Sequence, residues 1–68
     1  MGHLMLVKLT NAAEPFVGKD LLINSIQVLS VFEADVEDKK VTVIYGVSKD
    51  SWQVQESLDR VLELFKMI

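Results

Sequence analysis

The side chains best suited to chemistry form one dense acidic group. Four carboxylates fall within a short stretch, at Glu33, Asp35, Glu37 and Asp38. Carboxylates at alternate positions could coordinate Ca²⁺. Their spacing is not that of an EF-hand loop, however, and two lysines follow at once. We therefore expect a solvated hairpin turn here rather than a cation site.

Serine-based catalysis would lack its general base. Ser48, Ser51 and Ser57 each need a histidine for activation, and the one histidine of the chain is His3. The segment Met1–Leu4 stands before a second methionine and has the character of a vector-derived extension. We therefore leave His3 out of the functional argument.

The segment Gly46–Ser51 superficially resembles a phosphate-binding loop. Such a loop needs two glycines, followed by a lysine and a serine or threonine that open a helix. Here a single glycine ends one predicted strand and another predicted strand follows. The chain also has no cysteine, which excludes disulfides and cysteine-based zinc sites. We predict that the protein is not an enzyme and has no catalytic residue, metal or cofactor.

Length and composition indicate one small domain, residues 5–68, with a thin core. A chain of 68 residues buries only about 60% of the surface that its unfolded form exposes. Hydrophobic residues make up 50% of the sequence, which is generous for so little interior. Because disulfides and metals are excluded, self-association is the remaining route to added stability.

Charge and hydropathy narrow the choice of partners. The net charge is −3 and the seven lysines and arginines are scattered, so no basic stripe is present to neutralise phosphates. No apolar run approaches the roughly 20 residues of a transmembrane helix. The first residues do not show a charged n-region followed by an apolar h-region, so we expect no signal peptide. We expect a cytoplasmic protein without a membrane partner, and nucleic acid is not the expected ligand.

The apolar runs predict a strand-rich chain that ends in a helix. The expected fold class is α+β, a small antiparallel β-meander of four or five strands with one C-terminal helix. The predicted elements are strands over Met5–Thr10, Ser25–Ala34, Val41–Val47 and Ser51–Gln55, a loop over Ala12–Asp20 with room for a short edge strand, turns over Val36–Lys40 and Ser48–Asp50, and a helix capped by Ser57.

The stretch Leu21–Val36 carries two conflicting signals. Its spacing of large aliphatic residues fits one face of a helix, whereas its β-branched and aromatic content favours a strand. We give the second signal more weight. The predicted strand has Ile26, Val28 and Phe32 on one side and Leu29 and Val31 on the other. Both sides are then partly apolar, so the second face needs a cover.

The C-terminal segment predicts an amphipathic helix. Asp59 lies in its first turn, where the helix dipole favours an acid. A helix this short is not stable alone and must dock on the sheet or on another subunit. The expected buried stripe is Leu58, Val61, Leu62 and Phe65, and Leu64, Met67 and Ile68 widen the apolar surface beyond it.

Two aromatic residues, Tyr45 and Trp52, have the chemistry to stack on bases or to anchor an interface. Apolar and polar residues alternate along Ser51–Gln55. We therefore expect Trp52 and Val54 to face inward over the final helix, with the glutamines of that strand facing solvent.

Several short segments occur in an order that is shared with known small proteins. They are Val7–Thr10, Leu22–Asn24, a two-stranded hairpin, and Trp52–Leu58 leading into Val61 and Leu62. This order resembles the FlbD-like proteins of flagellar operons and, slightly better, short phage-encoded proteins of unknown function. In both groups an aromatic-x-Val-x-Glu-Ser step leads from the last strand into the terminal helix.

The hairpin departs from the flagellar pattern, which usually turns on a glycine-containing pair. Here the charged segment Glu37–Lys40 takes its place. The resemblance implies a strand-rich sheet with a C-terminal helix, self-association and, if the protein is phage-encoded, a location in the host cytoplasm. It implies no catalytic residues.

We predict a non-enzymatic accessory protein that acts through protein–protein contacts. A nucleic-acid-binding regulator is the alternative. One helix covers only one face of a sheet, so we also predict a homo-oligomer that buries the remaining apolar residues. The expected interface residues are Leu29, Val31, Leu64, Met67 and Ile68.

Overall fold

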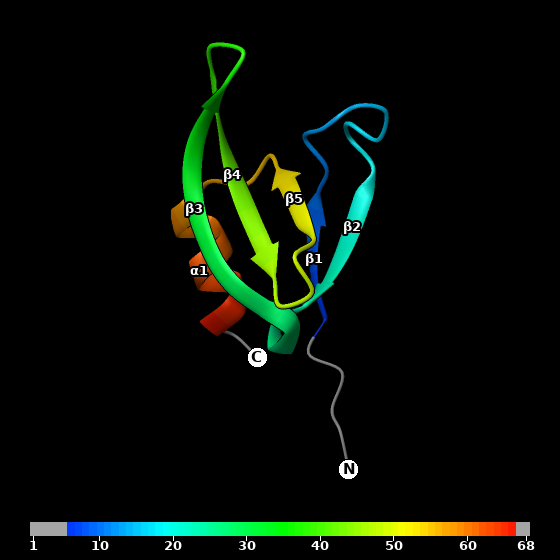
Figure 1. Ribbon diagram of the computed structural model, residues 1–68, viewed down its shortest axis with the longest axis vertical. Helices are drawn as coiled ribbons and strands as arrows, with labels where there is room; N and C mark the ends of the chain where they lie inside the picture. The colour runs from blue at the N-terminus through cyan, green and yellow to red at the C-terminus, as the bar shows by residue number, and fades with distance from the viewer. Residues whose placement is uncertain (1–5, 67–68) are drawn as a thin grey trace.

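Five strands and one α-helix make up residues 6–66, the part of the chain that the computed structural model describes (Figure 1). They confirm the predicted α+β class with a C-terminal helix. The elements are β1 (Leu6–Thr10), β2 (Asp20–Asn24), a 3₁₀ turn (Ser25–Gln27), β3 (Val28–Val36), β4 (Lys39–Gly46), β5 (Ser51–Val54) and α1 (Leu58–Lys66).

The strands form two antiparallel sheets, β1–β2 and β3–β4–β5. The end of β1 joins them, because Asn11 and Val54 form an isolated antiparallel bridge. Beside this bridge the Gln55 backbone N–H donates to the Thr10 carbonyl at 2.9 Å. The spatial order is therefore β2–β1–β5–β4–β3, and the strands curve around a common core (Figure 1).

The stretch Leu21–Val36 is mostly extended, but it is not one strand. Its first residues belong to β2, which the residue pattern did not predict. In the 3₁₀ turn that follows, the Asn24 side chain accepts a hydrogen bond from the Ile26 N–H at 3.1 Å. The prediction of a strand from Ser25 was therefore wrong over its first three residues, since this asparagine cap redirects the chain.

The two faces of β3 also differ from the predicted alternation. A β-bulge lies between Val28 and Ser30, and an extra residue shifts the alternation of side chains beyond it. Val28 and Val31 both pack against the core, whereas Leu29 and Phe32 are exposed. Placing Leu29 on the same face as Val31 was wrong for this reason.

A two-residue turn joins β3 to β4. Val36 pairs with Lys39, and the residues between them, Glu37 and Asp38, have φ angles of +50° and +66°. Positive φ at both central positions is the type I′ geometry, which matches the twist of the flanking strands. The predicted charged turn is present but shorter, because both lysines that follow it belong to β4.

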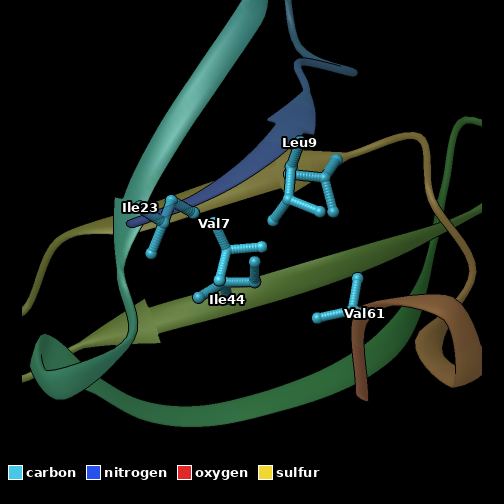
Figure 2. Packing of buried hydrophobic residues seen from close by; sticks show 6 residues of the cluster. Val7, Leu9, Ile23, Ile44 and Val61 are labelled. Carbon is cyan, nitrogen blue, oxygen red and sulfur yellow. The ribbon is translucent and has the colours of Figure 1, made fainter. Parts of the chain in front are cut away.

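The core lies between the curved strands and α1. Side chains from β1, β2, β4 and α1 point toward one another there (Figure 2). Partly buried residues, among them Val31 and Trp52, pack around them. The inward orientation predicted for Trp52 is thus confirmed. The central cluster consists of Val7, Leu9, Ile23, Ile44, Val54 and Val61.

The N-terminus of α1 is capped as predicted. The Ser57 hydroxyl accepts a hydrogen bond from the Arg60 N–H at 3.1 Å, which satisfies one of the free N–H groups of the first turn. Asp59 lies in that turn. The cap therefore fixes where the helix begins and how it leaves β5.

The buried stripe of α1 is rotated from the prediction. Val61 is fully buried, and Leu64 and Phe65 pack against the core. Leu62, which the prediction placed in the stripe, is 43% exposed. The stripe is centred on Val61 because residues three and four positions later, and not the next one, share its face.

We expect Asp38→Gly to stabilise the protein by about 0.5–1 kcal/mol. A left-handed residue other than glycine costs about 1–2 kcal/mol, which outweighs the extra freedom that glycine gives the unfolded chain. Urea unfolding measures the change. Asp35→Gly is the matched control and should destabilise, since it puts glycine within a strand. Destabilisation by both substitutions would contradict the assigned turn geometry.

Candidate functional site

The sheet β3–β4–β5 has one covered face and one open face. Val31, Ile44 and Trp52 lie on the inner face, where they contact the core cluster beneath α1. Side chains alternate between the two sides of a strand, so their neighbours project the other way. The residues that project this way, Phe32, Val43 and Tyr45, are called the outer face below.

Two aromatic rings dominate the outer face. Phe32 and Tyr45 stack with their ring centroids 5.5 Å apart and their planes at 26°. They are 39% and 41% exposed, while Val43, which lies opposite Phe32 on the strand of Tyr45, is 9% exposed. An exposed aromatic pair of this kind retains a large part of its apolar area in water. The outer face is therefore the strongest candidate surface within residues 6–66.

The position of this pair follows from the hairpin turn. Since Val36 pairs with Lys39, Phe32 lies opposite Val43, and Tyr45 lies two residues further along β4. Diagonal neighbours on one face of an antiparallel pair are within reach of aromatic side chains. The sequence pattern pointed to Tyr45 as a candidate for an exposed aromatic contact but not to Phe32. Phe32 could have been recognised as its partner from the length of the β3–β4 turn. A two-residue turn fixes which residues of the two strands lie opposite one another.

The predicted interface residues fall in three different environments. Leu29 is 72% exposed at the bulge of β3. Val31 and Leu64 are partly buried and pack against the core. Met67 and Ile68 lie outside the described residues. Among the predicted interface residues that lie within residues 6–66, Leu29 is therefore the one whose side chain is largely exposed.

The acidic group is spread along the hairpin. Glu33 and Asp35 belong to β3, whereas Glu37 and Asp38 form its turn. Within residues 6–66 no three acidic or histidine side chains gather as a metal ion would require. His3 lies outside that range. No helix in the same range is long and apolar enough to cross a membrane.

A cleft of about 250 Å³ lies between the end of β2 and the β4–β5 turn. Leu22, Val47 and Trp52 give it an apolar lining, and Asp50 is the one ionisable residue among those that line it. Gly46 allows the Trp52 ring to approach, because a Cβ there would lie 3.1 Å from the indole. The cleft therefore has the composition of a small apolar pocket without an acid–base pair.

A polar joint lies where β1 meets the segment between β5 and α1. The Glu56 carboxylate accepts two hydrogen bonds from Thr10, one from its N–H and one from its hydroxyl, both at 2.9 Å. The Thr42 hydroxyl donates to the Glu56 carbonyl at 2.7 Å. Glu56 thus connects β1, β4 and the start of the helix.

No family model, curated protein or solved structure matches this chain. The resemblance to FlbD-like and phage-encoded proteins therefore stays a prediction. The Glu-Ser step that carries it has a structural role here, since Glu56 holds β1 and Ser57 caps α1. The role of Glu56 could not be predicted from the residue pattern, because its partner Thr10 is distant in the chain.

We expect Glu56→Ala to lower the free energy of unfolding by about 1–3 kcal/mol, because it leaves the partly buried Thr10 N–H without an acceptor. Urea unfolding measures the loss. Glu63→Ala is the control, since Glu63 forms only an exposed pair with Arg60 at 3.7 Å and such pairs contribute little. Equal midpoints for the two variants would show that the joint does not stabilise the fold.

Proposed function

We propose that the protein is a non-enzymatic accessory module that binds another protein through its outer face. The observation that carries this proposal is the stacked, half-exposed pair Phe32 and Tyr45 on a sheet face that α1 leaves open. Aromatic residues are enriched among the residues that dominate binding energy in protein interfaces. In this proposal they are the anchors.

The surroundings of the pair support a protein ligand. Val43 lies beside the two rings on the same face of the sheet. Ser30 and Gln53, which lie next to Tyr45 and Val43 in the strand register, supply polar groups at the margin. An apolar centre with a polar rim is the usual anatomy of a protein interface.

The single ionisable side chain in the Trp52 cleft supports a binding role over catalysis. General acid–base chemistry needs a proton donor and acceptor within reach of the same substrate. With the resemblance stated above, we place the protein in the cytoplasm, or in that of the host if it is phage-encoded.

Affinity capture from the source cell, or from the infected host, tests the proposed surface. Tyr45→Lys should abolish capture of the target, since a charge in the apolar centre must be desolvated on binding. Leu62→Lys is the matched control, because Leu62 is equally exposed, at 43%, but lies on α1. It should leave capture unchanged.

The opposite pattern would contradict the proposal. If Leu62→Lys abolished capture and Tyr45→Lys preserved it, the binding surface would lie on the helix. Fluorescence of Trp52, the only tryptophan, verifies that both variants keep the native core.

A nucleic-acid-binding regulator is the second candidate, and the exposed aromatic pair favours it too. Aromatic residues on an open sheet face are a platform for unpaired bases. The net charge of −3 opposes it, since phosphate contacts need basic side chains. A mobility-shift titration with single-stranded oligonucleotides at low salt separates the two candidates. Binding that weakens steeply with added salt would favour this second function.

A further inference from the structure

β3 is the longest strand and has one free edge. It spans nine residues and, within residues 6–66, pairs with β4 alone. Its place at the end of the strand order is visible in Figure 1. A long open edge exposes backbone N–H and C=O groups that can pair with another strand.

The hairpin register shows which residues present those groups. The pair Val36–Lys39 closes a two-residue turn, so these two residues exchange hydrogen bonds, and every second pair along the ladder does the same. The residues between them direct their backbone groups away from β4. These are Val31, Glu33 and Asp35.

The acidic side chains of β3 restrict how it can pair with itself. A two-fold axis at Glu33 would place that residue opposite its own copy, and an axis at Ala34 would place Glu33 opposite Asp35. Like charges directly opposite one another are destabilising. An axis at Phe32 avoids both conflicts, because Glu33 then faces Val31 and Asp35 faces Leu29.

Among the axes that avoid like charges, the one at Phe32 also gives the longest regular contact. The bulge between Val28 and Ser30 interrupts the strand, so the regular overlap about Phe32 runs from Ser30 to Ala34 in each copy. The outward backbone groups of Val31 then meet those of Glu33 in the other copy, which completes hydrogen bonds on both sides. Charge, length and hydrogen-bond phase thus select one register.

We propose that two copies of this chain pair edge to edge through β3, antiparallel, with Phe32 on the two-fold axis. The two three-stranded sheets become one sheet of six strands. The two Phe32 rings meet across the seam, and each keeps its stacked Tyr45 on the outer side. The exposed Leu29 lies at each end of the seam, opposite Asp35 of the other copy.

The dimer extends the function proposed above, and its role as a binding surface rests on that proposal. Pairing at the edge leaves the outer face open, and it joins two such faces into one apolar surface with four aromatic rings. A target protein would meet the doubled surface. The interface is isologous, as expected for a closed dimer.

Cysteine cross-linking tests the register, because the chain has no cysteine of its own. Ser30 of one copy should face Ala34 of the other, in a non-hydrogen-bonded pair with Cα atoms about 4.5 Å apart. That separation suits a disulfide. Within one copy these two residues are about 13 Å apart, so no internal bond can form.

We expect a mixture of the Ser30→Cys and Ala34→Cys proteins to form a disulfide-linked dimer under mild oxidation. The rate should be roughly a hundredfold higher than for either protein alone, since pairing raises the effective concentration to the millimolar range. Light scattering on the unmodified protein should give twice the chain mass of 7.7 kDa at micromolar concentration.

Two results would overturn the proposal. Equal, slow cross-linking in all three samples with a monomeric mass would exclude pairing, and rapid cross-linking of one variant alone would move the axis to that residue. The measurement involves no target protein. A negative cross-linking result would therefore not affect the conclusion from affinity capture. A negative capture result would likewise not affect the evidence for the dimer.

Discussion

The hydrogen bonds of Glu56 reinforce the place where two small sheets meet, beside the bridge between Asn11 and Val54. Its carboxylate binds Thr10 at the end of β1, and its carbonyl binds the Thr42 hydroxyl of β4. With the joint closed, Leu9, Ile44 and Val54 lie on the same side and bury one another. The helix α1 then covers the inner face.

Covering one face leaves the other open. A single helix can cover only one face of a sheet. The stacked rings of Phe32 and Tyr45 are the visible consequence, since they shield Val43 and remain half exposed themselves. The proposed dimer uses the free edge of β3, and the proposed binding surface uses the outer face. Neither is covered by α1.

Local patterns in the sequence predicted the parts of the fold that depend on near neighbours. The Ser57 cap, the inward Trp52 and the fold class follow from residue types and short spacings. The bulge at Leu29 and the Asn24 cap did not, because each interrupts a run of residues that suits a strand throughout. Without the bulge, the faces of β3 are assigned wrongly. The number of apolar residues predicted that some of them would stay exposed. Which face of the sheet carries them depends on how the faces of β3 are assigned.

Amide hydrogen exchange along β3 tests the dimer most directly, because neighbouring residues serve as controls for one another. The N–H groups of Ser30, Phe32 and Ala34 point toward β4 and should be protected at every protein concentration. Those of Val31 and Glu33 point to the free edge. We predict that they are protected at high concentration and lose this protection on dilution into the monomer. Fast exchange at these two positions at all concentrations, with the alternate residues protected, would contradict the account.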